Sequence, residues 1–253
     1  DTGITITGKY YYVGDVIDVC IKDYLNLSDS IKDCLHGFRV SVTFKEKTTP
    51  ISPYKFGYSL EKNSIDDKNH IDDKNHINDI SNKNLTVIPI VYKCNSRENQ
   101  LSLLAGLIDR SGMFVSSRNI YYINTTNKVF VNDIVFLIRS LGLSSKVTEN
   151  IIGDSSHNTI EYTINIQGIN IHEIPVVILR KAKLIVDDYE WLTYQKEMTS
   201  SIEVIKQPAD KFFGFQIDGN SRFLLGDFTV THNTSLAKLG IANCLQDENG
   251  VSR

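Results

Sequence analysis

The chain has 253 residues, of which 41% are hydrophobic and 23% are charged, and this composition is typical of a folded globular protein. With 27 basic and 30 acidic residues the net charge is −3, so the sequence lacks the strongly basic field of many nucleic-acid-binding proteins. No apolar run reaches the roughly 18 residues of a membrane span. The four cysteines lack the spacing of a metal site and the density of a disulfide scaffold. We therefore expect an intracellular protein with no membrane partner.

The first part of the chain predicts short elements followed by a linker. We expect strands at residues 4–6, 10–13 and 39–44, and a short helix at residues 29–35 that Ser28 caps. Residues 61–84 contain the hexad IDDKNH twice in succession and the beginning of a third copy. Each hexad offers one apolar residue and cannot build a core, so we interpret this segment as a solvated linker. Its two histidines, six residues apart, do not share a helix face, so we expect no metal site there.

The middle of the chain, residues 85–190, predicts an α/β domain. Helices are expected at residues 99–108 and 133–141, the second capped by Asn132, with a further helical stretch after Pro175. Strands are expected at residues 113–115, 119–123, 145–150 and 159–167. Residues 201–233 are β-rich, with strands expected at residues 202–205, 213–217, 222–225 and 228–231 and a hairpin turn at Gly226 and Asp227. An amphipathic helix of different character is expected at residues 234–245, which indicates a seam between two proteins.

The tripeptide His232-Asn233-Thr234 at this seam holds a complete set of groups for breaking one peptide bond. The side-chain amide of Asn233 can attack its own backbone carbonyl, which forms a succinimide and breaks the bond to Thr234. A preceding histidine can serve as general acid or base in this otherwise slow reaction. The Thr234 hydroxyl can act as a nucleophile on an acyl group that arrives from elsewhere. The tripeptide alone also fits a plain turn in which Thr234 caps a helix.

The sequence FLLGDFTVTHNT at residues 223–234 resembles the C-terminal splicing block of inteins, and residues 212–225 resemble the strand pair that precedes it. The resemblance implies a β-rich Hint fold in which His232 assists cyclisation, Asn233 cyclises and Thr234 is the first host residue. It implies autocatalytic protein splicing, which needs no cofactor. The sequence departs from the family at one position, because Ser221 stands where a second histidine is usual.

The sequence LLAGLIDRSGMF at residues 103–114 resembles the LAGLIDADG motif of DOD-type homing endonucleases, with seven of nine motif positions matching. In that family two such helices approach closely, and the small residues of the motif here are Ala105, Gly106 and Gly112. The sequence PYKFGYSLEKN at residues 53–63 is similar to the family's first helix. The resemblance implies an inserted α/β endonuclease domain in which carboxylates hold Mg²⁺ at the scissile phosphate.

Two positions depart from an active endonuclease. The metal-binding acid of the motif aligns with Ser111, and the corresponding acid of the first helix aligns with Lys62, whereas Asp109 aligns with an acid that is usually structural. Residues 101–190 hold eight Lys or Arg and nine Asp or Glu, which is a poor footprint for binding phosphates. We therefore expect a degenerate domain that binds double-stranded DNA weakly, with Mg²⁺ a cofactor only if the domain were active.

Residues at both ends complete this interpretation. TSLAKLGIA, from Thr234 onward, resembles the helix that follows the Walker A lysine in Lon-like AAA+ ATPases, which makes residues 234–253 a host segment. No histidine near the start lies in the Thr-x-x-His motif of an N-terminal splicing block. We therefore expect the chain to begin inside the intein, with a missing N-terminal intein segment and a host polypeptide as its partners.

The expected fold is mixed, with a partial β-rich Hint module and an inserted α/β LAGLIDADG-like domain. The expected divisions are residues 1–50 for a Hint and linker segment, 51–190 for the degenerate endonuclease domain with its linker at 61–84, 191–233 for the C-terminal Hint segment and 234–253 for the host. Two other functions stay open from the sequence. One is a homing endonuclease that cuts intein-free host DNA, and the other is an AAA+ ATPase fragment with an inert insertion.

Overall fold

The computed structural model describes residues 3–12, 14–60, 87–154, 157–178, 198–208, 211 and 217–232. The chain forms two compact units, and each is described by itself. Unit 1 comprises Asp1–Arg39 and Thr199–Arg253, and unit 2 comprises Val40–Met198, so unit 2 interrupts unit 1 in the sequence. The predicted linker at residues 61–84 and the predicted host segment lie outside the described residues. Among the helices of the described ranges, none has the length and apolar character needed to cross a membrane.

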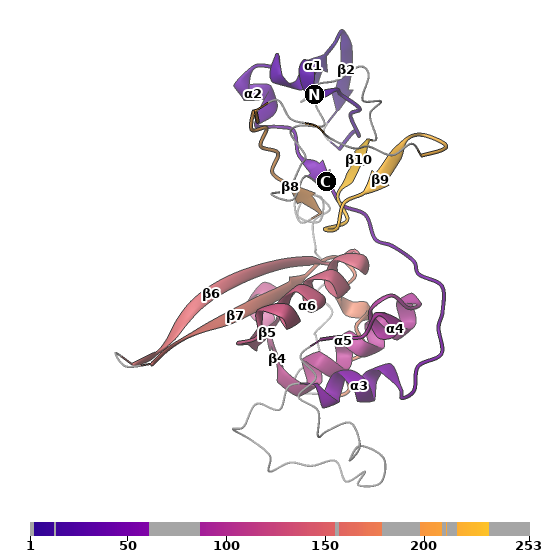
Figure 1. Ribbon diagram of the computed structural model, residues 1–253, viewed down its shortest axis with the longest axis vertical. Coiled ribbons are helices and arrows are strands. Elements are labelled where there is room, and N and C mark those ends of the chain that lie inside the picture. The colour runs from indigo at the N-terminus through magenta and orange to yellow at the C-terminus, as the bar shows by residue number, and fades with distance from the viewer. Residues whose placement is uncertain are drawn as a thin grey trace. The chain divides into compact units, whose positions relative to one another are not determined.

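In the part of unit 1 that the structure describes, the chain forms short antiparallel strand pairs and two short helices. Its elements in chain order are β1 (Gly3–Ile6), β2 (Lys9–Tyr12), α1 (Ile21–Leu25), α2 (Asp29–Lys32), β3 (Gly37–Phe38), β8 (Thr199–Ser200), β9 (Arg222–Leu224) and β10 (Val230–His232). β1 pairs with β2, β9 pairs with β10, and β3 pairs with β8 (Figure 1). The β3–β8 ladder therefore joins the segments that precede and follow unit 2 in the sequence. An isolated bridge between Arg39 and Thr229 connects the β9–β10 hairpin to the same region.

Most sequence predictions for unit 1 are confirmed where the structure describes them. The strands predicted at residues 4–6, 10–13, 222–225 and 228–231 correspond to β1, β2, β9 and β10, and the helix predicted at residues 29–35 is present as the shorter α2. The strands predicted at residues 39–44 and 202–205 are wrong, because both segments are irregular apart from the bridge at Arg39. The alternating pattern of residues 39–44 finds no partner strand. The Val42 N–H donates instead to the Ser140 carbonyl oxygen, at 2.8 Å. The helix predicted at residues 234–245 and nearly all of the strand at 213–217 lie outside the described residues.

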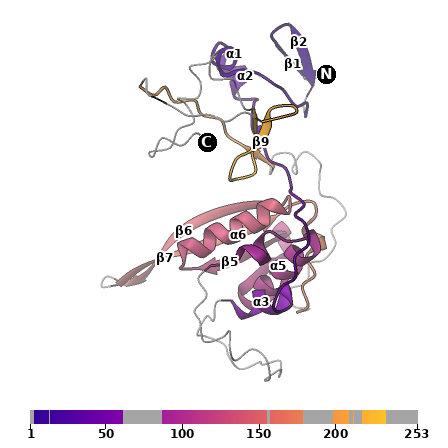
Figure 2. The ribbon, with the colours of Figure 1, turned by 45° about the vertical axis from the view of Figure 1, so that its right-hand side comes forward.

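Unit 2 is an α/β domain built on a four-stranded antiparallel sheet. Its elements are α3 (Pro53–Ser59), α4 (Ile90–Lys93), α5 (Arg97–Ser111), β4 (Gly112–Val115), the 3₁₀ turn η1 (Ser116–Arg118), β5 (Ile120–Thr125), α6 (Lys128–Ser140), β6 (Ser144–Asp154), β7 (His157–Gln167) and the 3₁₀ turn η2 (Ile171–Glu173). The strand order is β4-β5-β7-β6. α6 lies along one face of the sheet, and β6 and β7 form a long paired ribbon (Figure 2).

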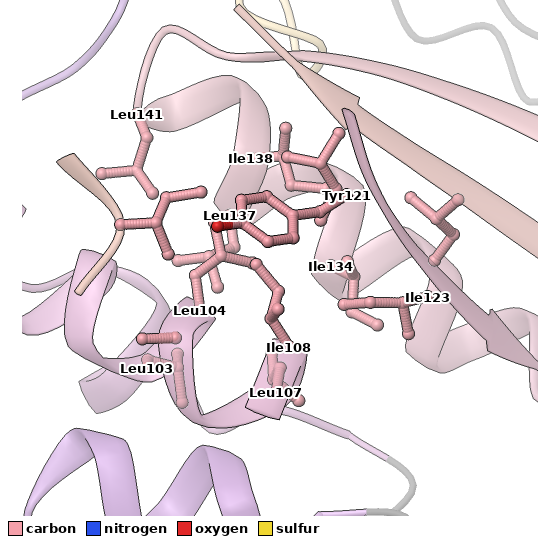
Figure 3. Close-up of a cluster of buried hydrophobic side chains, with 14 of the residues drawn as sticks. Leu103, Leu104, Leu107, Ile108, Tyr121, Ile123, Ile134, Leu137, Ile138 and Leu141 are labelled. Carbon is pink, nitrogen blue, oxygen red and sulfur yellow. The ribbon is translucent and has the colours of Figure 1, made fainter. Parts of the chain in front are cut away.

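The core of unit 2 lies between the sheet and its helices. Tyr121 and Ile123 of β5 are buried while the intervening Tyr122 is partly exposed, which is the period-two pattern of a strand with one covered face. Leucines and isoleucines of α5 and α6 pack against this face, as Figure 3 shows, and each is at most 1% exposed: Leu103, Leu104, Leu107, Ile108, Ile134, Leu137, Ile138 and Leu141. Burying one such side chain stabilises a fold by about 1.5–3 kcal/mol.

α3 and α5 approach each other so closely that each requires a glycine. A Cβ added to Gly106 on α5 would collide with the carbonyl oxygen of Tyr54 on α3. A Cβ added to Gly57 on α3 would collide with the carbonyl oxygen of Leu103 on α5. The two backbones are therefore in direct contact, which glycine permits because it has no side chain.

Most predictions for unit 2 are also confirmed. The helix predicted at residues 99–108 lies within α5, and the strands predicted at residues 113–115, 119–123, 145–150 and 159–167 correspond to β4, β5, β6 and β7. The segment that resembles the endonuclease family's first helix is helical as α3, up to Ser59. The helical stretch predicted after Pro175 is wrong for residues 175–178, which are irregular, and the rest of it lies outside the described residues. α4 was not predicted.

The predicted start of α6 is wrong by five residues. The helix begins at Lys128, and the cap is Asn127, whose side-chain oxygen accepts hydrogen bonds from two backbone N–H groups of the first turn. Asn132 and Asp133 resemble a cap in sequence because such residues favour helix starts. Asp133 is instead buried within the helix, where it forms an ion pair with Lys93 and accepts a hydrogen bond from the Ile88 N–H at 2.7 Å. A buried, paired carboxylate explains the misleading pattern.

We expect Gly106→Ala to lower the free energy of unfolding of unit 2 by about 2 kcal/mol or more, because the new Cβ forces two helix backbones apart. The gain in helix propensity, about 1 kcal/mol, does not offset this clash. Urea unfolding with hydrogen exchange at the α5 amides measures the effect.

Ser102→Ala is the matched control, since it makes an alanine at a partly exposed position of the same helix. It should leave the stability nearly unchanged or slightly raised. Equal stability of the two variants would show that the α3–α5 crossing tolerates a side chain.

Candidate functional site

The C-terminal hairpin of unit 1 places His232 at the end of β10. After β9 the chain reverses at Gly226 and Asp227, as the sequence predicts. It then returns as β10, which runs antiparallel to β9 so that His232 pairs with Arg222. The His232 side chain is 43% exposed. The imidazole is therefore partly open to solvent, and it immediately precedes the peptide that the sequence predicts to break.

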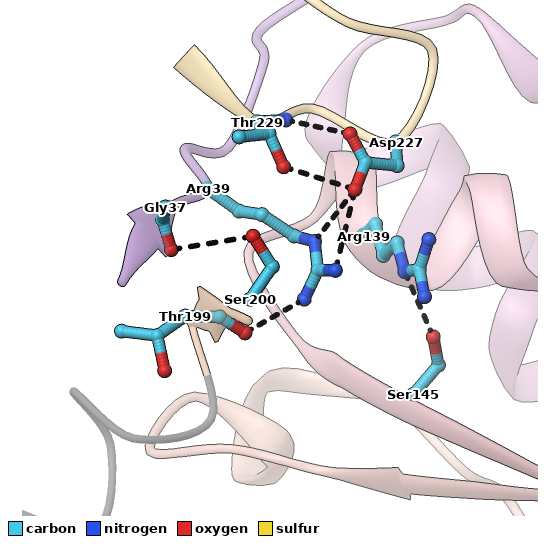
Figure 4. A network of polar contacts seen from close by, with 8 residues as sticks. All are labelled: Gly37, Arg39, Arg139, Ser145, Thr199, Ser200, Asp227 and Thr229. Carbon is cyan, nitrogen blue, oxygen red and sulfur yellow. Dashed lines mark hydrogen bonds and ion pairs between the residues drawn. The ribbon is translucent and has the colours of Figure 1, made fainter. Parts of the chain in front are cut away.

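Arg39 holds three separate segments of unit 1 together (Figure 4). Its Nε and Nη2 donate to Asp227 Oδ2 at 3.3 and 3.2 Å, and its Nη1 donates to the Thr199 carbonyl oxygen at 3.0 Å. Asp227 also accepts hydrogen bonds from the N–H and the hydroxyl of Thr229, at 3.1 and 2.9 Å. One guanidinium therefore links the end of the first segment, the start of the second and the turn of the β9–β10 hairpin.

The environment of Asp227 favours its charged form. Partial burial raises the pKa of this carboxyl. The hydrogen bonds from Thr229 and the Arg39 guanidinium outweigh the burial, and they hold the pKa of Asp227 below its usual value. The carboxylate is thus a stabilising partner in the folded unit.

Asp18 is a candidate site residue that the sequence analysis missed. It lies in the irregular segment between β2 and α1, and its Oδ2 accepts a hydrogen bond from Arg222 Nη2 at 2.9 Å. The same oxygen lies 3.8 Å from His232 Nε2. Asp18 is separated from Arg222 by 204 positions, so no local sequence pattern could have revealed the contact.

Ser221, at the position of the family's second histidine, lies just before β9. Its backbone is left-handed, with φ of 56°, a region that few non-glycine residues adopt. The Asn220 side chain supports this turn by accepting a hydrogen bond from the Arg222 N–H at 3.1 Å. Ser221 brings a hydroxyl to the hairpin and not a titratable ring.

The other predicted splicing residues, Asn233 and Thr234, lie outside the described residues, as does Lys62 of the endonuclease motif. Their roles stay predictions. The structure describes the hairpin up to His232, and it describes Asp109 and Ser111 at the end of α5.

Asp109 on α5 is buried, and it forms hydrogen bonds with α3 and with the irregular segment after η2. It is 2% exposed and accepts a hydrogen bond from the Tyr54 hydroxyl on α3 at 3.0 Å. It also accepts from the backbone N–H groups of Val177 and Ile178, at 2.6 and 3.3 Å. Burial, and then the hydrogen bond to Asp109, raise the pKa of Tyr54, so this hydroxyl stays protonated and donates. These three hydrogen bonds hold α5 to its neighbours.

Ser111 does not fit a magnesium site. Its hydroxyl donates to the Leu107 carbonyl oxygen at 3.2 Å, a bond within its own helix. Mg²⁺ in nucleases is held by carboxylates, and a neutral hydroxyl supplies no compensating charge. No group of three His, Cys, Asp or Glu side chains suited to a metal occurs in the part of the chain that the structure describes.

The three small residues of the motif occupy different places. Gly106 lies in the α3–α5 crossing, and Ala105 is fully buried. Gly112 begins β4, where an added Cβ would lie 2.9 Å from the Cα of Ile108. The close approach at Gly112 is therefore to the last turns of α5 itself.

The outer face of the sheet in unit 2 carries little charge. The strand register places Met113, Tyr122, Asn165 and Lys146 in one cross-strand row, of which only the lysine is charged. The next row toward the hairpin tip contains Asn124, Thr163 and Thr148, which are all neutral. These rows offer amides and hydroxyls but few cations for a phosphate backbone.

Residues 87–174 match the family model of homing endonucleases. The matched range includes α4, α5, the whole sheet, α6 and η2. This part of the chain is therefore similar to homing endonuclease domains. A comparison with curated proteins gave no match to the chain.

We expect Asp227→Asn to destabilise unit 1 by about 1–2 kcal/mol at neutral pH, because an amide loses the charge-assisted bonds to Arg39. The folded-state pKa of Asp227 is lowered, so its stabilisation is present above the unfolded value of about 3.9 and is lost as the pH falls through the folded pKa. Hydrogen exchange at the β9 and β10 amides measures the difference.

Asp29→Asn is the control, because the Asp29 side chain is 99% exposed and its ion pair with Lys32 is worth little. The difference between Asp227→Asn and the parent chain should disappear in acid. A difference that persisted at low pH would contradict the role of the charge.

Proposed function

We propose that this chain performs the C-terminal steps of protein splicing, as an intein that carries an inserted endonuclease domain. The observation that carries the proposal is the nested order of the two units. Unit 1 is built from Asp1–Arg39 and Thr199–Arg253, and the homing endonuclease domain lies entirely within the unit between them. A free-standing endonuclease has no need of a second compact unit assembled from both of its flanks.

The hairpin of unit 1 supports the site of reaction. β10 ends at His232, and the turn before it is fixed to Arg39 through Asp227. The strand anchored in this way holds His232, the residue that precedes Asn233 in the sequence. Such positioning is a large part of any rate enhancement.

The proposed reaction breaks one bond and forms another. Asn233 Nδ2 attacks the backbone carbonyl carbon of Asn233, and the bond from that carbon to the Thr234 nitrogen breaks. The Nδ2 group loses a proton and the Thr234 nitrogen gains one, with the His232 imidazole as the carrier. The products are a chain ending in a succinimide and a segment beginning with a free Thr234 amine.

Full splicing adds an acyl transfer before this step. The Thr234 hydroxyl would receive the upstream host acyl group as an ester, and after cyclisation the ester would shift to the Thr234 amine as a peptide. The partners of this reaction are an N-terminal intein segment and a host polypeptide that is joined to residues 234–253. The Lon-like AAA+ character of these residues stays part of the same proposal.

We expect the chain to release the peptide of residues 234–253, faster when an N-terminal intein segment that begins with Cys and contains Thr-x-x-His is supplied. His232→Ala should slow the release by about 10²–10⁴-fold, the usual contribution of a general acid or base. Mass spectrometry should find the larger product one water lighter than its hydrolysed form.

Asn233→Asp is the closest control, because it keeps the shape of the side chain and removes the attacking amide. Asn233→Ala removes both. Release at the same rate from these variants, or no release from the parent chain with or without the added segment, would refute the splicing assignment.

We propose further that the endonuclease domain has lost its cleavage activity. The support is the hydroxyl of Ser111 at the position of the metal-binding acid, bonded within its own helix. Residues 87–174 hold seven basic and seven acidic residues, so the matched domain has no excess of positive charge for DNA. The buried Asp109, which supports the fold, is retained.

We expect the chain to leave intein-free host DNA uncut in the presence of Mg²⁺, as measured by gel electrophoresis of supercoiled and linear substrates. The double variant Ser111→Asp, Lys62→Asp is the matched comparison, since it restores both aligned carboxylates. Site-specific nicking or a double-strand break by the parent chain would favour the alternative of an active homing endonuclease.

A further inference from the structure

Asp18 and the C-terminal hairpin come together from opposite ends of unit 1. Asp18 lies in the first segment, and its Oδ2 accepts a hydrogen bond from Arg222 Nη2 at 2.9 Å. The same oxygen lies 3.8 Å from Nε2 of His232, the residue that ends β10. One carboxylate oxygen is thus shared between an arginine and the histidine that the proposed reaction uses.

The register of the hairpin explains why both side chains reach the same carboxylate. His232 and Arg222 are directly opposite each other in the β9–β10 ladder. Side chains of such a pair project from the same face and lie close together. A single acid on that face can therefore contact both of them, and Arg222 holds the acid beside the imidazole.

We propose that Asp18 is a positioning residue for His232 in the cyclisation of Asn233. This inference rests on the proposed splicing function. A carboxylate facing Nε2 orients the imidazole and favours the proton on that nitrogen. Nδ1, the ring nitrogen nearer to the histidine main chain, is then the nitrogen that can accept a proton.

The orientation matters for the proton balance of the step. Nδ1 takes the proton that leaves the Asn233 amide as the new carbon–nitrogen bond forms. The protonated ring then gives a proton to the Thr234 nitrogen as the old bond breaks. Asp18 gains and loses no proton in this sequence. It fixes the ring and stabilises the imidazolium that exists between the two transfers.

Arg222 limits how strongly Asp18 can act on the His232 imidazole. It is the charged group that contacts Asp18 directly, and its positive charge competes with the imidazolium for the same oxygen. The side chains of Asp18, Arg222 and His232 are 55%, 41% and 43% exposed. Interactions between such exposed charges are screened by salt, so the contribution of Asp18 should depend on ionic strength.

The test compares release of the 234–253 peptide from Asp18→Asn, Asp18→Glu and Asp29→Asn with release from the parent chain. Asp18→Asn should be slower by about 10-fold, the lower end of the effect of losing an orienting partner of a reacting histidine. Asp18→Glu keeps the charge and should recover part of the rate. Asp29→Asn removes an exposed aspartate paired with Lys32 and should release normally.

Two readouts separate positioning from a structural role. High salt should slow the parent chain but leave Asp18→Asn unchanged, and hydrogen exchange at β9 and β10 should be the same in both. The nitrogen NMR shifts of His232 in alkaline solution should report a larger fraction with the proton on Nε2 in the parent chain than in Asp18→Asn. This measurement needs no cleavage.

The outcomes distinguish the inference from the function on which it rests. If the parent chain and His232→Ala release the peptide equally, the splicing assignment fails. If His232→Ala is slow but Asp18→Asn releases at the parent rate with an unchanged His232 tautomer, the role of Asp18 is overturned and the splicing assignment stands. A slow Asp18→Asn variant with a lost salt dependence and a changed tautomer supports the inference.

Discussion

Unit 1 depends on the bonds that Arg39 makes to Asp227 and Thr199. These bonds join residues that are 188 and 160 positions apart in the chain. Closing a loop of that length is entropically costly for a flexible chain. Here the loop contains unit 2, which has its own core. This core restricts the distance between the two ends of the loop. One partly buried guanidinium can therefore fix the hairpin that ends at His232, because the intervening chain has a core of its own.

Unit 2, which contains the residues that match the homing endonuclease family model, has a well-packed core. Gly57 and Gly106 keep the helix backbones in contact, and Asp109 still anchors α5 to α3. Each of these residues is required by packing, whatever the domain does. Ser111 makes its hydrogen bond within α5 and does not contribute to the contact with α3 through this bond. Within this motif the packing therefore depends on Gly106 and Asp109 and not on the Ser111 side chain.

Local patterns in the sequence predict much of this fold, and the failures have clear physical causes. Alternation identifies β5 and β7 because one face of each is covered. Asn132 and Asp133 mislead because the same residue types serve as caps and, when paired with Lys93, as buried charges. The chemistry proposed for the tripeptide rests on its residue types, and Asn233 and Thr234 lie outside the described residues. The contact of Asp18 with the hairpin depends on tertiary packing across two hundred positions, which periodicity and motif spacing do not encode.

The pairing of β3 with β8 determines where the chain leaves and re-enters unit 1. Gly37 lies against Ser200 so closely that an added Cβ would be 2.7 Å from the serine Oγ, so the two ends of the insertion leave unit 1 side by side. A short turn in place of unit 2 would therefore be enough to connect these two strands as a hairpin. The β3–β8 ladder of unit 1 thus fixes only where unit 2 begins and ends along the chain, and it places no demand on the sequence between these points.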